Sequence, residues 1–244
     1  MSGSGATSPD RVRALAGDAW LFRWQVEVEA EERFTRLSAA LERLGAPAAL
    51  VAMARRSAGD ERRHAVHCAR LAAAHGRPVP ATPPPPAPPV APSGLAEREA
   101  VTYELAAACC VTESVSVAVL TALLPEARDP GLRAVLQELA EDEVVHARLG
   151  WAHLASEHRR GATAFLGPWL PAMLAGSQDG DLFGPPPPGR DDAALLLAGV
   201  LPHARQRELF AEALREVVFP GLEQCGVDAS AGRRWLDGQL ARAS

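Results

Sequence analysis

The chain has 244 residues, a length that suits one domain or one domain with an appendage. Hydrophobic residues make up 48% of it, which is enough for a sizeable core and excludes a chain that is disordered throughout. The net charge is only −5 and no basic stripe runs along any segment, so nucleic acid is a poor candidate partner.

The N-terminus and the cysteines bear on location. The opening MSGSGATSPD lacks the apolar core of a signal peptide, and no apolar run approaches the roughly 20 residues that a membrane span needs. No CxxC pair occurs among the four cysteines, Cys68, Cys109, Cys110 and Cys225. We therefore expect a cytoplasmic protein that makes no membrane contact.

The first two helical patterns form a hairpin, preceded by a flexible N-terminus at 1–17. Residues 18–44 place their apolar side chains on one stripe of a helix, which ends at the sequence GAP. The second helix covers 48–75, with Gly76 as its stop signal.

A proline-rich segment follows at 77–94, with the sequence RPVPATPPPPAPPVAPSG. This composition predicts an extended connector that reaches roughly 3 Å per residue, enough to run the length of a helix. Docking to a partner with an SH3-like groove is the alternative to this spacer role.

The second hairpin comprises helices at 95–124 and at about 130–160, the latter opened by Asp129 as N-cap and Pro130 at N1. Two hairpins joined by one long crossover are the connectivity of ferritin-like four-helix bundles. We therefore predict an all-α fold with this bundle at 18–160.

An α-helical extension is expected at 161–244. Residues 163–190 are rich in Gly and Pro, and helical patterns return at 191–218 and 229–241, with Pro220-Gly221 between them. Strand signals are absent from the whole sequence, and we expect the extension to pack on the bundle.

The motif DExxH occurs twice, once in each hairpin. Asp60-Glu61 precedes His64, and Asp142-Glu143 precedes His146 at the same spacing. On a helix this spacing places the glutamate and the histidine on one face, one turn apart. A single ExxH is usually a solvated surface, but two copies in matched positions indicate the two halves of a metal site.

Two further carboxylates are expected from the other helices. Glu113 lies in the nearly uncharged run CCVTESVSVAVL, where an isolated carboxylate is costly unless a cation compensates it. On the first helix Glu27 is centred on the apolar stripe, and Glu31 at its edge is an alternative or extra ligand. Glu29 and Glu32 point elsewhere.

These residues resemble the ferritin-like di-iron carboxylate superfamily over about 18–160. The pattern Glu27-x-x-Ala30-x-x-x-Phe34 is also similar to the first helix of rubrerythrins and aldehyde-deformylating oxygenases, which have Tyr where Phe34 stands. Rubredoxin-type cysteine pairs are missing, which excludes a complete rubrerythrin, and two histidines are unlike the ferroxidase centre of most ferritins.

The resemblance implies two Fe ions, with Mn as an alternative, because oxygen and imidazole ligands suit both metals. It also implies that Asp60 and Asp142 each accept the outer N–H of the opposite histidine. The implied ligands are Glu27, Glu61, His64, Glu113, Glu143 and His146.

Three classes of function compete. The first is a non-haem di-iron oxidoreductase that uses O2 or peroxide on a small organic substrate, with an electron-donor protein; the chain could form a homodimer. The second is a ferritin-like iron-handling (ferroxidase) or peroxide-reducing protein, and the third is a metal-free scaffold. The extension favours the first class, because it could shape a substrate pocket. Its candidate apolar wall, for which plain packing is the alternative, is Trp169, Leu170, Met173 and Leu174.

Overall fold

The computed structural model describes residues 9–82, 84, 88–178, 182–186 and 190–243. The protein is 77% helix, and no strand occurs in this part of the chain. The predicted all-α class is therefore confirmed.

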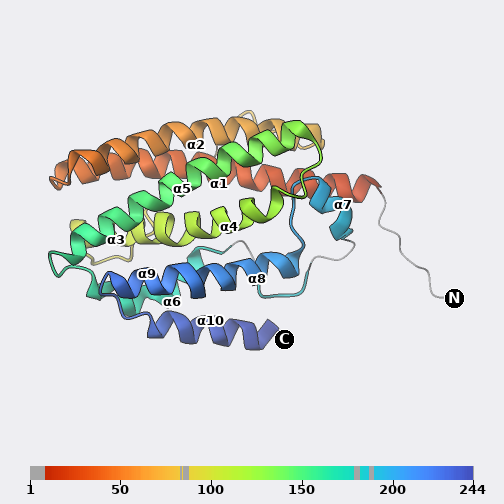
Figure 1. Cartoon of the computed structure of the whole chain (residues 1–244). Helices are drawn as coiled ribbons and strands as arrows, with labels where there is room; N and C mark the ends of the chain where they lie inside the picture. Colours follow the sequence, from red (N-terminus) through yellow and green to blue (C-terminus); the bar gives the residue numbers. More distant parts are fainter. Residues whose placement is uncertain (1–8, 83, 85–87, 179–181, 187–189, 244) are drawn as a thin grey trace.

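Helices α1 (Pro9–Arg43) and α2 (Ala48–Ala74) lie side by side as a hairpin (Figure 1). Because α1 begins at Pro9, the expected flexible N-terminus is wrong for 9–17, while 1–8 lie outside the described residues. The reason is packing: Ala16 is fully buried in a small apolar cluster with Leu195 and Val200, which come from the C-terminal part of the chain.

The proline-rich connection returns the chain to the end of this hairpin at which α1 turns into α2. Helix α3 (Glu97–Leu105) begins beside the α1–α2 turn, where Arg98 donates to the Leu44 carbonyl at 2.9 Å and Arg43 pairs with Glu97 at 2.8 Å. Since α2 ends at the opposite end of the hairpin, the connection has to run back along the helices, as a spacer would (Figure 1). Residues 83 and 85–87 of it lie outside the described part.

The third long helix is continuous over Glu97–Leu123 but changes its hydrogen-bonding pattern in the middle. It consists of α3, a π-helical segment η1 (Ala106–Thr112) and α4 (Glu113–Leu123). By length and composition this helix could cross a membrane, whereas the sequence predicts no such span. However, 56% of its most apolar window is buried inside the protein. The core helix of a soluble protein passes the same test.

Helix α5 (Pro130–His158) completes the set of four long helical segments. The Asp129 side chain caps it by accepting from the Leu132 amide at 2.7 Å, with Pro130 in the first turn, as predicted. The helix packs closely on η1, because a Cβ at Gly150 would lie 2.5 Å from the Cβ of Cys109. This close approach brings the second DExxH motif toward Glu113.

The C-terminal part covers the face of α4 that points away from α1 and α2 (Figure 1). Contacts of α8 with α4 and of α6 with η1 hold it there. Its elements are η2 (Ala164–Trp169, a 3-10 helix), α6 (Leu170–Gly176), α7 (Asp192–Leu197), α8 (His203–Ala213), η3 (Leu214–Val218, a π-helix), α9 (Phe219–Gln224) and α10 (Ser230–Ala243).

Two expectations for this part were wrong. Residues 164–176 are helical, although the Gly- and Pro-rich composition of 163–190 predicts no helix before 191. Their apolar side chains join the core between the extension and the third long helix. Pro220 does not separate two helices either. The π-helical segment η3 precedes it, so the proline falls in the first turn of α9, where its missing N–H costs little.

Candidate metal centre

Six buried side chains from four long helices meet in the middle of the molecule. One group comprises Glu27, Glu61, His64 and Glu143, and within it one ligand atom from each residue lies within 4.8 Å of all the others. A second group meets the same criterion and comprises Glu61, Glu113, Glu143 and His146. Glu61 and Glu143 belong to both groups, so the two candidate positions for a cation are adjacent and share these two carboxylates.

The two DExxH motifs supply the shared carboxylates and both histidines. His64 and His146 are 0% exposed, and Glu61 and Glu143 are 1% and 3% exposed. Each glutamate lies three residues before its histidine on α2 or α5, so both side chains project inward from one helical face. Apolar clusters flank the site, and the ring of Phe34 lies 5.3 Å from that of His146, centroid to centroid. The histidine side of the site is therefore shielded from water.

Both imidazole rings are oriented in the same way. Their Nδ1 atoms face the glutamates: His64 Nδ1 lies 3.1 Å from Glu61 Oε2, and His146 Nδ1 lies 2.8 Å from Glu143 Oε2. Their Nε2 atoms face the aspartates of the opposite motif, Asp142 and Asp60, each at 3.3 Å. If Nε2 donates its proton to the aspartate, Nδ1 has a free lone pair directed at the group of carboxylates.

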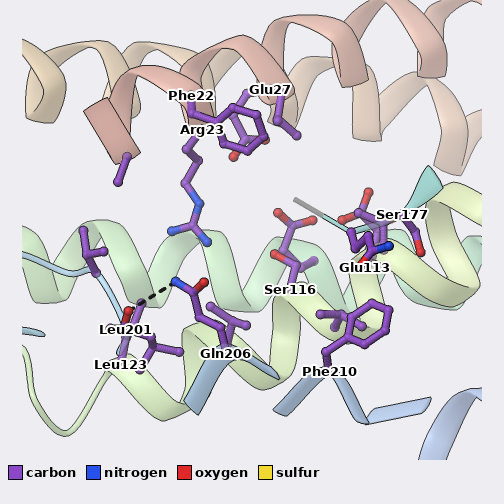
Figure 2. A pocket seen from close by; sticks show the side chains of 18 of the residues that line it. Phe22, Arg23, Glu27, Glu113, Ser116, Leu123, Ser177, Leu201, Gln206 and Phe210 are labelled. Carbon is purple, nitrogen blue, oxygen red and sulfur yellow. Dashed lines mark hydrogen bonds between the residues drawn. The ribbon is translucent and has the colours of Figure 1, made fainter. Parts of the chain in front are cut away.

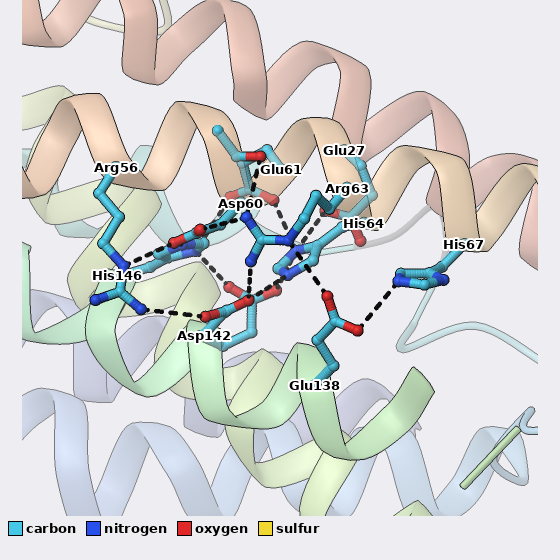
Figure 3. Close-up of polar contacts among 12 residues, drawn as sticks. Glu27, Arg56, Asp60, Glu61, Arg63, His64, His67, Glu138, Asp142 and His146 are labelled. Carbon is cyan, nitrogen blue, oxygen red and sulfur yellow. Dashed lines mark hydrogen bonds and ion pairs between the residues drawn. The ribbon is translucent and has the colours of Figure 1, made fainter. Parts of the chain in front are cut away.

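Two arginines join the aspartates on the outside of the site (Figure 3). Arg63 pairs with Asp60 and with Asp142, at 2.8 Å in both cases. Arg56 approaches the same two carboxylates, at 3.5 Å and 3.8 Å. Spacing alone could have suggested the contacts with Asp60, which is three or four residues away on α2, but the contacts with α5 depend on the tertiary fold. Neither arginine is predicted from the sequence as part of the site.

Burial and mutual repulsion dominate the electrostatics of Glu27 and Glu113. For Glu61, burial is outweighed by hydrogen bonds to His146 and His64, which lower its pKa to about 2. Burial, followed by the charges of Glu61 and Glu143, raises the pKa of Glu27 well above its usual value. Burial and the same two charges also raise the pKa of Glu113. Without cations, these two carboxyls therefore tend to retain protons.

The histidines carry the complementary shift. Burial opposes a charge on His146, but hydrogen bonds to Glu143 and Glu61 outweigh it and raise its pKa. The same balance raises the pKa of His64. Without cations, protons on these side chains therefore offset the negative charge of the buried carboxylates, and divalent cations could take over that role.

The donor set fits a divalent cation such as Fe(II) or Mn(II). It consists of carboxylate oxygens and imidazole nitrogens, and neither group includes a cysteine. Cys109 is nearby, but burial, followed by the charge of Glu113, keeps its pKa well above the usual value and so keeps it a thiol. These buried groups could hold a metal ion.

The π-helical segment places Glu113 at the site. The segment ends at Thr112, immediately before this residue, and Thr112 Oγ1 donates to the Ala107 carbonyl five residues earlier at 3.1 Å. A π-turn adds a residue to the helical repeat and so rotates everything after it, which is why such turns often occur at functional sites. The position of Glu113 in an apolar run was visible in the sequence, but this irregularity was not.

The first helix contributes Glu27, which is 6% exposed and belongs to the first group. The structure brings Glu31 into neither group; its carboxylate accepts hydrogen bonds from Arg62 of α2 instead. The Glu29 side chain accepts from Gln25 at 3.0 Å on the exposed surface.

A cavity of about 370 Å³ opens onto the glutamates from the side of the C-terminal part. It is lined by Glu27, Glu61, Glu113 and Glu143, by one face each of α1 and α4, and by residues of the extension (Figure 2). The apolar wall expected at 169–174 is not part of it. Leu170, Met173 and Leu174 are buried in the core, and the extension contributes Leu182, Val200, Leu201 and Phe210 instead.

Comparisons with known proteins found no matching protein family, no matching curated protein and no matching solved structure.

Proposed function

We propose that the chain is a non-haem di-iron oxidoreductase that uses O2 or peroxide to oxidise a small organic substrate. In this proposal, residues 18–160 form a ferritin-like four-helix bundle and residues 161–244 close one side of it. Two Fe ions are the proposed cofactor, with Mn as the alternative, and an electron-donor protein supplies reductant in the cytoplasm.

The two overlapping ligand groups support a pair of metals. Glu61 and Glu143 are common to both groups, whereas Glu27 with His64 and Glu113 with His146 each belong to one. Four carboxylates neutralise two divalent cations, which removes the cost of burying the carboxylates as charges. A pair of ferrous ions bound there would supply two electrons to dioxygen in one encounter.

The protein's own residues would orient and shield this chemistry. Asp60 and Asp142 hold the Nε2 atoms of the histidines, and Arg63 fixes both aspartates. Phe34 and the flanking apolar clusters exclude water from the histidine side. Access is left on the side of Glu27 and Glu113, which line the cavity.

The cavity is the observation that carries the choice of an oxidoreductase over an iron-handling protein. Its volume of about 370 Å³ lies in the range of small-molecule sites, and its wall combines apolar and polar side chains. A passage for iron needs no apolar wall, whereas a small organic ligand does.

The test monitors the reaction of bound Fe(II) with O2 by stopped-flow absorbance, using from two to fifty equivalents of iron per chain. We expect a burst limited to about two irons per chain, after which the centre waits for reductant and substrate. Oxidation that scales with added iron over many turnovers would assign the chain to the iron-handling class instead. If the chain neither binds nor oxidises iron, the metal-free scaffold is the remaining class of function.

A variant that fills the cavity sharpens this test. Val119 lines the cavity on α4 and is partly exposed, so Val119→Phe should narrow the cavity with little strain on the core. If the cavity is a substrate site, the variant retains the two-iron burst. If the cavity is the route of iron, the variant slows the burst itself.

A further inference from the structure

Charged side chains in the cavity bear on the chemistry of its ligand. Three arginines line it: Arg23 and Arg33 from α1, and Arg190 from the segment before α7. Arg190 already has partners within the protein, because it pairs with Asp192 and donates to the Leu201 carbonyl, both at 3.0 Å. Arg23 and Arg33 make no ion pair or hydrogen bond with any described residue.

Arg23 has the position of a ligand-binding group. It lies one helical turn before Glu27, so both side chains line the cavity from the same face of α1. Its guanidinium lies over the ring of Trp20, 5.4 Å from the ring centroid. Figure 2 shows its guanidinium directed across the cavity toward Gln206 of α8 rather than toward the glutamates.

In the absence of cations the charge of Arg23 acts on Glu27, whose rise in pKa it opposes, but two bound cations would leave this guanidinium without a counter-ion. Four glutamates compensate two divalent cations, so in the metal-bound state the charge of Arg23 is not needed at the centre. A guanidinium binds a carboxylate well, because two parallel N–H groups match its two oxygens. The rest of the wall is largely apolar, with Phe22, Val26, Val119, Leu123 and Phe210 around the space.

We propose that the cavity binds a small organic acid with an apolar body, and that Arg23 holds its carboxylate. The apolar body would lie along α4 and Phe210, and its far end would reach the side of the centre formed by Glu27 and Glu113. Arg23 is therefore a positioning residue that selects for acids. This inference rests on the proposed function, because two bound cations are what leave Arg23 uncompensated.

The experiment compares hexanoate, hexan-1-ol and hexyl phosphate, which share one apolar chain and differ in the head group. Their dissociation constants are measured by calorimetry on the full chain loaded with Zn(II), which occupies such a site without redox chemistry. We expect hexanoate to bind about tenfold or more tightly than hexan-1-ol, since a charge-assisted hydrogen bond has about that effect. Hexyl phosphate tests the head group, and tighter binding of hexyl phosphate than of hexanoate would overturn the choice of a carboxylate.

Arg23→Gln is the decisive variant, and Arg33→Gln is its matched control. Both remove one positive charge from the cavity face of α1, and neither removes an ion pair with a described residue. Arg23→Gln should abolish the preference for the acid, Arg23→Lys should restore part of it, and Arg33→Gln should retain it. Thermal melting curves of the variants confirm that each is folded.

Other outcomes contradict the proposal. Equal loss in both glutamine variants would mean that the arginines act only as diffuse counter-charges to the centre. A preference that survives Arg23→Gln would place the acid on the metals themselves, and equal binding of acid and alcohol, or no binding of either, would remove the acid site. Metal content, measured by elemental analysis of the same samples, tests the proposed function separately, so the two failures are distinguishable.

Discussion

The two sides of the glutamate cluster differ in what surrounds them. On the α2–α5 side, both histidines contact an aspartate, and Arg63 pairs with both aspartates at 2.8 Å. On the α1–α4 side, Glu27 and Glu113 line a cavity, and burial raises the pKa of both. A network of ion pairs and hydrogen bonds holds ligands in place, whereas carboxyls that line a cavity with raised pKa values are accessible to a bound molecule. We infer that the first side positions the metals and the second side meets the substrate.

The largest effect should come from a carboxylate that serves both sides. Glu61→Ala removes a donor from both ligand groups at once, so we expect metal affinity to fall by more than about 100-fold at both positions. Glu29→Ala is the control, because that side chain lies on the surface and belongs to neither group. Calorimetric titration with Mn(II) measures both. Equal affinity in the two variants would mean that Glu61 is not a ligand.

Metal binding on the α2–α5 side can be weakened without replacing a proposed metal ligand. Arg63→Met removes the group that pairs with both aspartates, so the histidines lose orientation and metal affinity should fall about 10–100-fold. Arg62→Met on the same helix is the matched control, because Arg62 pairs with Glu31 outside the centre. The same titration applies, and an unchanged affinity in Arg63→Met would show that the aspartates hold the histidines alone.

Metal binding should strengthen as the pH rises. In the metal-free protein the pKa values of Glu27, Glu113, His64 and His146 are all raised, so these groups retain protons to higher pH than usual. A metal has to displace those protons, and each displaced proton changes the apparent affinity about tenfold per pH unit. Titrations with Mn(II) between pH 5.5 and 7.5 should therefore show weaker binding at the lower pH. A flat profile would mean that the ligands are already deprotonated.

The smallest effect is expected at the edge of the centre. Glu31 pairs with the exposed Arg62, and such surface pairs contribute about 0–1 kcal/mol to stability. Glu31→Gln should therefore lower the free energy of unfolding by less than about 1 kcal/mol, measured by urea denaturation. It should also leave metal stoichiometry unchanged, and a loss of one metal would make Glu31 a ligand.

Periodic features of the sequence predicted the parts of the molecule that depend on single helices. The all-α class followed from apolar periodicity, and the two Glu-x-x-His pairs were visible because three residues make about one helical turn. Glu113 is a lone charge in an apolar run, and the place of Glu27 on the apolar stripe of the first helix predicts that it points inward. The structure brings these four glutamates together with His64 and His146.

The remaining features depend on contacts between distant segments or on irregular backbone. The π-helical turn before Glu113 has no periodic signature, and Arg56 and Arg63 reach Asp142 only once α2 and α5 are packed. The cavity wall combines α1 and α4 with residues of the extension from Ser177 and Gln178 to Gln206 and Phe210, which no local pattern could place. The early start of α1 likewise depends on contacts of Ala16 with Leu195.

Metal stoichiometry tests the central claim most directly. The protein should be reconstituted with Fe(II) under anaerobic conditions, freed of unbound iron, and analysed for iron per chain. Two overlapping ligand groups predict close to two irons per chain, and Glu113→Ala should lower this number because it removes a donor from one group only. A value near zero in the unaltered protein would contradict the account and leave a helical scaffold with a buried, proton-compensated cluster.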